Sequence, residues 1–138
     1  MPEREVFHVR TAAERSGDDV RLAVTVTLPD GVHIEPHRPA DPYLIPTVLD
    51  VEGLDDVSIE YPSPVVKDLG WKGLTLGVLE GVLPFVITGR VPTATTHLNG
   101  TLTYQPCIGG ACLPPRTVAW AAPPTGTTEY SVLNALAA

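Results

Sequence analysis

Proline and glycine divide this chain into short segments, and this punctuation constrains its fold more than any other feature. The 138 residues include 15 prolines and 12 glycines, spread along most of the length. Within the segments between them, apolar and polar residues alternate with a period of two, not with the 3.6-residue repeat of a helix. Alternation of this kind is typical of β-strands that bury one face. The chain is therefore predicted to be all-β.

The clearest predicted strand covers residues 19–28, where every second residue is Val or Leu. One face of this strand should enter the core. Residues 74–79 and 82–91 are predicted to form a hairpin around Glu80 and Gly81, with Pro84 at an edge or a bulge because proline cannot donate to a ladder. Further strands are expected at residues 5–10, 32–35, 47–51, 57–61, 97–105 and 116–121. About eight or nine short strands favour an immunoglobulin-like β-sandwich.

Length and composition favour one domain. We expect residues 1–122 to form the sandwich and residues 123–138, which are rich in Thr, Gly and Ala, to form a linker or tail with a turn of helix at 131–137. No apolar run approaches the roughly 18 residues of a membrane span, so direct membrane insertion is not expected. The formal charge is -7 without a cluster of Lys or Arg, which argues against nucleic acid as a partner.

Both cysteines, Cys107 and Cys112, lie in the connection between the strands predicted at 97–105 and 116–121. A disulfide that closes about six residues contributes only about 2 kcal/mol in the loop-entropy model, against nearly 5 for one that closes about 100. A purely structural disulfide is therefore the less favoured interpretation. Residues 108–111 (IGGA) are small and flexible, so a partner sulfur can approach, which favours a redox-active pair. Pro114 and Pro115 prevent a helix directly after Cys112, so no helix dipole should lower the pKa of either thiol.

A metal site is the third interpretation, with His33 and His37 joining the two cysteines. These residue types suit zinc or copper. Pro36 interrupts the histidine pair, however, and four residues between the cysteines is wider than in most zinc knuckles. We therefore predict no metal and no cofactor apart from a Cys107–Cys112 disulfide.

The segment YQPCIGGACLPP at residues 104–115 resembles the N-terminal, extracytoplasmic domain of the thiol:disulfide interchange protein DsbD family. The resemblance extends over most of the chain and includes DGVH at 30–33, YPSP at 61–64 and LP at 83–84. It implies an immunoglobulin-like domain that takes two electrons from a thioredoxin-like donor and passes them to extracytoplasmic disulfide-bearing proteins. By this resemblance Cys112 forms the mixed disulfide with the partner and Cys107 resolves it.

The resemblance also implies enzymatic thiol:disulfide interchange in the periplasm by a monomer, tethered to a membrane segment in a full-length protein. The N-terminus shows no apolar signal region, which leaves open a cytoplasmic location or an export signal already removed. The even number of cysteines favours an extracytoplasmic location. The alternative function is a non-enzymatic extracytoplasmic binding module in which the disulfide only shapes a loop.

Members of the family have a loop with an aromatic side chain that covers the cysteines. The long segment at residues 62–73 matches this loop in position, so Trp71 is the expected cap residue, with Leu69 as the second candidate; the alternative for Trp71 is an anchor in the core. Relatives place tyrosines beside the pair, where this chain has His33 and Glu35. Either residue could act as a proton acceptor, and Tyr104 is a further residue expected to shape the site.

Overall fold

The computed structural model describes residues 6–39, 43–68, 75–92 and 97–133, and all secondary structure in these ranges is β. The strands are β1 (Val6–Ser16), β2 (Asp19–Thr27), β3 (Val32–Ile34), β4 (Val48–Glu52), β5 (Asp55–Glu60), β6 (Val65–Asp68), β7 (Thr75–Glu80), β8 (Val82–Arg90), β9 (Leu98–Tyr104), β10 (Cys107–Ile108), β11 (Ala111–Cys112), β12 (Arg116–Ala122) and β13 (Gly126–Leu133). The predicted all-β class is confirmed. No helix in the described ranges is long and apolar enough to cross a membrane.

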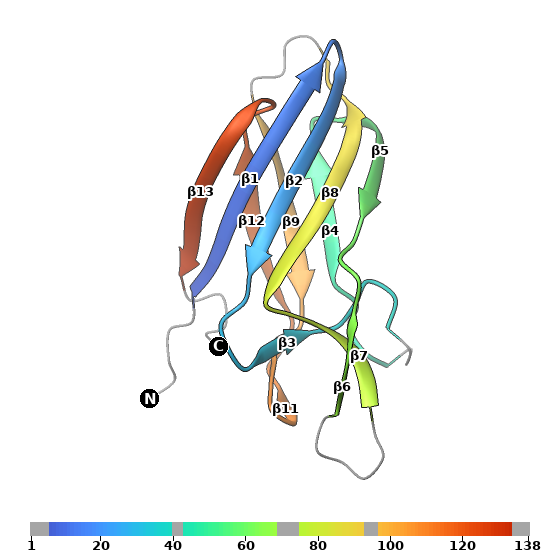
Figure 1. Ribbon diagram of the computed structural model, residues 1–138, viewed down its shortest axis with the longest axis vertical. Helices are drawn as coiled ribbons and strands as arrows, with labels where there is room; N and C mark the ends of the chain where they lie inside the picture. The colour runs from blue at the N-terminus through green and yellow to red at the C-terminus, as the bar shows by residue number, and fades with distance from the viewer. Residues whose placement is uncertain (1–5, 40–42, 69–74, 93–96, 134–138) are drawn as a thin grey trace.

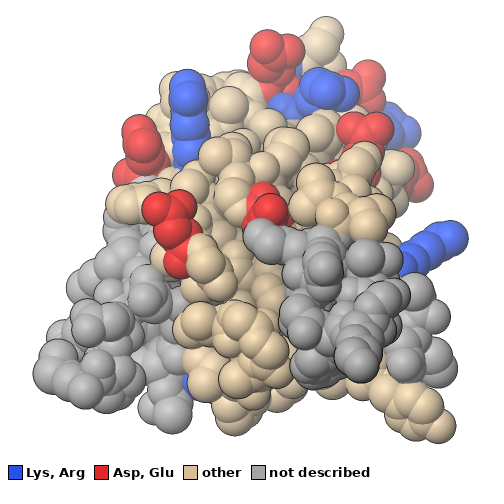
Figure 2. All heavy atoms as spheres, turned by 60° about the horizontal axis from the view of Figure 1, so that its bottom comes forward, with Lys and Arg blue, Asp and Glu red and all other residues tan. Residues whose placement is uncertain are grey.

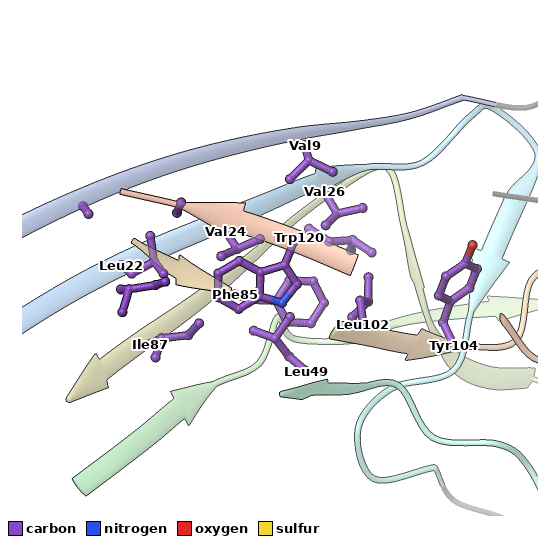
Figure 3. Packing of buried hydrophobic residues seen from close by; sticks show 14 of the residues in the cluster. Val9, Leu22, Val24, Val26, Leu49, Phe85, Ile87, Leu102, Tyr104 and Trp120 are labelled. Carbon is purple, nitrogen blue, oxygen red and sulfur yellow. The ribbon is translucent and has the colours of Figure 1, made fainter. Parts of the chain in front are cut away.

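Two antiparallel sheets form the sandwich (Figure 1). One sheet has the strand order β13-β1-β2-β8-β5 and the other has the order β12-β9-β4. The alternation predicted for residues 19–28 is confirmed, because Val20, Leu22, Val24, Val26 and Leu28 are all at most 4% exposed. These side chains meet Phe85, Leu102 and Trp120 between the sheets (Figure 3).

Glycine at position 100 allows the smaller sheet to pack tightly against the core. A Cβ atom on Gly100 would lie 1.8 Å from the carbonyl oxygen of Asp50 and 2.7 Å from the ring of Trp120. Gly100 pairs with Val51 of β4 and with Trp120 of β12, so the large indole of Trp120 covers a position that has no side chain. Only glycine permits this close approach.

A third sheet, in the order β11-β10-β3-β7-β6, lies at one end of the sandwich (Figure 1). The turn expected at Pro29 to Gly31 leads into it, since Gly31 has φ +82° and the Val32 N–H donates to the Pro29 carbonyl at 3.2 Å. Val32 and Ile34 of β3 enter the main core. Because side chains alternate along a strand, His33 lies on the opposite face of this small sheet.

The predicted hairpin at residues 74–91 is wrong, although both of its strands exist. β7 pairs with β3 and β6, whereas β8 pairs with β2 and β5. The chain passes from one sheet to the other at Gly81, which has φ +74° and whose carbonyl accepts from the Leu28 N–H at 2.9 Å. Pro84 was expected at an edge or a bulge; it lies in the inner strand β8 opposite Thr25 of β2, beyond Val86, where the pairing of β8 with β5 ends.

The predicted linker at residues 123–138 is also corrected, because β13 pairs with β1 from Val6↔Leu133 to Ala13↔Gly126. The segment contains Thr127, Thr128 and Val132, whose β-branched side chains favour strands. The turn of helix expected at 131–137 is therefore replaced by strand as far as Leu133, and its remaining positions lie outside the described residues. More strands are present in the described ranges than the eight or nine expected, because β6, β10 and β11 are too short to show alternation.

Candidate functional site

The two cysteines face each other across a very short hairpin. Cys107 in β10 pairs directly with Cys112 in β11, and a disulfide joins them. Gly109 begins the two-residue turn with φ +61°, a conformation that tight hairpin turns require and that glycine adopts without strain. The pairing continues by one residue, because the Leu113 N–H donates to the Pro106 carbonyl at 2.9 Å. The disulfide therefore lies at one edge of the third sheet, in the hairpin of β10 and β11.

The two bonded cysteines differ in their access to solvent. Cys107 is only 1% exposed, whereas Cys112 is exposed. β11 is the edge strand of its sheet, while β10 lies between β11 and β3. A thiolate from another protein can therefore reach Cys112 more easily than Cys107, because exchange requires access to the sulfur under attack.

His33 is brought next to the disulfide by strand pairing. It lies directly opposite Cys107, and on its other side it lies opposite Glu80 of β7. His33 is 7% exposed, so the ring lies largely out of water. The sequence identifies His33 as a candidate site residue, whereas it places Glu80 in the turn of a predicted hairpin. Only knowledge of the long-range pairing between β3 and β7 could have identified Glu80.

Glu35 is only 3% exposed, which is unusual for a carboxyl group. Burial raises the pKa of its side chain above the ordinary value. Its backbone carbonyl accepts a hydrogen bond from the Thr47 hydroxyl, which ties the end of β3 to the chain that precedes β4. Glu35 follows His33 by two residues and lies just beyond the end of β3.

Tyr104 belongs to the core just before the hairpin. It is 0% exposed, and its ring points into the interior near the end of β9 (Figure 3). Desolvation raises the pKa of its phenol, with a smaller opposing effect from the positive charge of Arg116, the residue opposite it in β12. The phenol therefore stays neutral. Trp71 and Leu69, the expected cap residues, lie outside the described residues.

His37, the second histidine considered for a metal site, makes other contacts. His37 stacks on Tyr61 with the ring centroids 3.8 Å apart, and its Nδ1 donates to the Thr47 carbonyl at 2.9 Å. In the described part of the chain, no group of three or more His, Cys, Asp or Glu residues could hold a metal ion. The arrangement of these residues thus gives no support to the zinc or copper interpretation.

Several apolar side chains are exposed on the sheet that carries the disulfide. Ile108 in the hairpin is 47% exposed, and on β6, at the other edge of the same sheet, Val65 and Val66 are 47% and 77% exposed. Among the described residues, most charged side chains lie away from this end of the molecule (Figure 2). Contact with another protein here would therefore involve apolar side chains more than ion pairs.

An immunoglobulin-like sandwich with an accessible disulfide on a tight hairpin defines a class of thiol-disulfide exchange domains. Residues 1–122 match the family described as "Thiol:disulfide interchange protein DsbD, N-terminal". The chain therefore belongs to the family of DsbD N-terminal domains, and the predicted resemblance is confirmed. No match was found among curated proteins.

Two solved structures share the fold. The N-terminal periplasmic domain of ScsB from Proteus mirabilis aligns with a TM-score of 0.68 and 21% identity over 90% of this chain and 49% of that one. This chain thus spans about half the length of the ScsB domain. The Neisseria meningitidis DsbD N-terminal domain in the reduced form aligns with a TM-score of 0.58 and 18% identity over 89% of each chain. The immunoglobulin-like sandwich predicted from the sequence is confirmed.

Proposed function

We propose that this chain passes two electrons from a thioredoxin-like donor to extracytoplasmic disulfide-bearing proteins through Cys107 and Cys112. The observation that carries the proposal is the unequal exposure of the two bonded cysteines, with Cys112 open and Cys107 buried. Membership of the DsbD N-terminal family supports thiol-disulfide exchange as the type of reaction. The periplasm is the proposed compartment, since the ScsB domain of the same fold is described as periplasmic.

In the proposed reaction, Cys112 makes the contact between proteins. The Cys112 thiolate of the reduced domain attacks one sulfur of the partner's disulfide and releases the other partner sulfur as a thiolate. Cys107 then attacks the Sγ of Cys112, which forms the intramolecular disulfide and releases the second partner thiolate. The partner gains two electrons and two protons, and the domain loses them. Attack by a donor thiolate on Cys112 reverses the sequence and restores the dithiol.

The reactivity of Cys112 must come from its exposure to solvent and from the disulfide or thiolate that a partner brings. β11 ends at Cys112 and is followed by Pro114 and Pro115, so no helix begins at either sulfur. A lowered pKa of the kind produced at a helix N-terminus is therefore absent from the proposal. Rapid exchange depends instead on the open edge strand.

We assign control of access to the segment between β6 and β7, with Trp71 as the residue over the disulfide and Leu69 as the second candidate. The support is indirect: β6 ends at Asp68 and β7 begins at Thr75, so both ends of the segment are held in the sheet that carries the disulfide. The exposed Val65 and Val66 precede it on β6. A cap here would limit the approach of bulky groups to Cys112, which is itself exposed.

Trapping of partners tests the roles of the two sulfurs. Cys107→Ser leaves the exposed Cys112 able to attack but removes the sulfur that resolves the mixed disulfide. We expect this variant to accumulate covalent adducts with extracytoplasmic proteins or with a thioredoxin-like domain, visible on non-reducing gels and lost on reduction. Cys112→Ser is the matched control and should trap little.

The opposite pattern, in which Cys112→Ser traps and Cys107→Ser does not, would reverse the assignment. If neither variant forms adducts while both remain folded, the disulfide is a structural element of a binding module, which is the alternative function.

A further inference from the structure

Four side chains, one from each of four neighbouring strands, form a continuous row across the third sheet. Cys112 lies opposite Cys107, Cys107 lies opposite His33, and His33 lies opposite Glu80. Residues directly opposite in an antiparallel sheet point to the same face, with Cβ atoms about 4.5–5.5 Å apart. The row therefore reads thiol, thiol, imidazole and carboxylate across β11, β10, β3 and β7. No pattern in the linear sequence places these four groups together.

The face that carries this row is shielded from water near its centre. Val32 and Ile34 take the other face of β3 into the core, while Cys107 is 1% and His33 7% exposed. A thiol in such a place loses its proton to bulk water with difficulty, because burial disfavours the charged thiolate. An imidazole is the side chain best suited to take a proton near neutral pH.

A carboxylate faces the imidazole. Glu80 lies opposite His33 on β7, and the buried Glu35 follows His33 by two residues, just beyond the end of β3. Cys107 is the titratable group that faces it from β10. In the described part of β3 and the strands paired with it, these are the titratable groups on this face. Carboxylates near an imidazole stabilise its protonated form, so Glu80 is placed to support a proton on His33.

We propose that His33 accepts the proton of Cys107 in the resolving step, with Glu80 as its positioning residue. In the mixed disulfide, the Cys107 thiol gives its proton to the His33 ring, and its Sγ attacks the Sγ of Cys112. The Cys107–Cys112 bond forms as the bond between Cys112 and the partner breaks. The partner sulfur leaves as a thiolate with the electron pair of the broken bond, and the imidazolium returns its proton to that thiolate or to water.

The same proton transfer runs in the opposite direction when the disulfide is reduced. A donor thiolate attacks Cys112, and Cys107 leaves as a buried thiolate that the His33 imidazolium protonates. Leaving-group acidity controls the rate of such exchange, so a proton donor beside the buried sulfur favours departure. This inference rests on the proposed function, because it concerns a step of thiol-disulfide exchange at Cys107 and Cys112.

Stopped-flow reaction of the reduced protein with an aromatic disulfide that releases a coloured thiolate tests the inference. Attack by Cys112 releases the first coloured thiolate and resolution by Cys107 releases the second, so the two steps are read separately. In His33→Gln we expect an unchanged first phase and a second phase slowed on the order of 10–100-fold near pH 7, at or below the lower limit of what a positioned base contributes.

The pH dependence of the second phase separates proton transfer by His33 from a purely structural role, because loss of a structural contact would not change its shape. In the wild-type protein the second phase should level off once the imidazole is neutral and can accept the proton. In His33→Gln it should keep rising until the thiol itself ionises, at about pH 8.5 or above. His97→Gln, which removes an exposed histidine just before β9, is the control and should match the wild type.

Glu80→Gln provides a second test that does not alter the buried ring, since Glu80 is only partly buried. It should slow the second phase less than His33→Gln does. A second phase with unchanged rate and pH profile in both variants would overturn the inference, as would equal slowing of both phases. Failure of the proposed function looks different: the Cys107–Cys112 disulfide of the folded wild-type protein would then resist reduction by thioredoxin and by glutathione.

Discussion

At the scale of single residues, burial of Glu35 changes the pH at which its carboxyl group ionises. Its carboxyl group is almost fully buried, and the Thr47 hydroxyl bonds to its backbone carbonyl and not to the side chain. Desolvation therefore raises its pKa in the folded protein above the ordinary value of 4.5. Ionisation of Glu35 must then oppose folding.

The sign of this effect gives a prediction. A carboxyl group whose pKa is raised on folding stabilises the protein fully below its unfolded pKa, and this contribution is lost as the pH rises through the folded value. Glu35→Gln, which stays neutral, should be more stable than the wild type at pH 7–8, on the order of 1 kcal/mol. The difference should shrink toward pH 4. Urea unfolding at both pH values measures it, and an equal difference at both would show that ionisation is not involved.

Single residues of the site were predictable from the sequence only in part. The cysteine pair was evident from its spacing, and His33 and Glu35 were candidates from their place in the motif. The structure separates these two, because only His33 lies opposite Cys107. Glu80 was not predictable, since its proximity to His33 depends on a pairing between strands that are far apart in the chain.

At the scale of elements, strands with strong alternation were predictable and their partners were not. β2 follows its alternation closely, because each Val and Leu on one face is buried. The residues Glu80 and Gly81 carry the local signal of a hairpin turn, yet there the chain changes sheets. Local sequence determines that the chain turns, while the packing of the two sheets determines which strand it joins.

The segment between β6 and β7 is the element that we expect to control access to Cys112. Trp71→Ala should increase severalfold the rate at which the reduced protein reacts with a bulky maleimide, because a smaller side chain would leave more room for the reagent beside Cys112. Val66→Ala, on the exposed surface of β6, is the matched control and should leave the rate unchanged. An unchanged rate together with a large loss of stability in Trp71→Ala would show that Trp71 is a core anchor.

At the scale of the whole molecule, the fold and the disulfide are largely independent. Most of the core lies between the two sheets of the sandwich, while the disulfide lies in the third sheet at one end (Figure 1). Its cysteines are five residues apart in sequence. A crosslink over so short a loop contributes only about 2 kcal/mol. The domain can therefore be reduced and oxidised without loss of its core, as a carrier of electrons requires.

The distribution of charge also belongs to this scale. The chain carries a formal charge of -7, and the sheet that carries the disulfide exposes the apolar side chains of Ile108, Val65 and Val66. Charge on the rest of the molecule supports solubility. Apolar side chains at the end that carries Cys112 allow short-lived contact with proteins of different charge. The proposed exchange with a donor and with acceptors would use a surface of this type.

The reduction potential of the Cys107–Cys112 pair tests the central claim most directly. The native protein is equilibrated with thioredoxin and with glutathione buffers of known potential, and the reduced fraction is measured by alkylation and mass spectrometry. Exchange predicts a potential above about -300 mV, within the range of thioredoxin-like partners, and ready reduction of the folded protein. A pair that stays oxidised under these conditions, with a potential below about -300 mV, would be a structural disulfide and would contradict the proposed function.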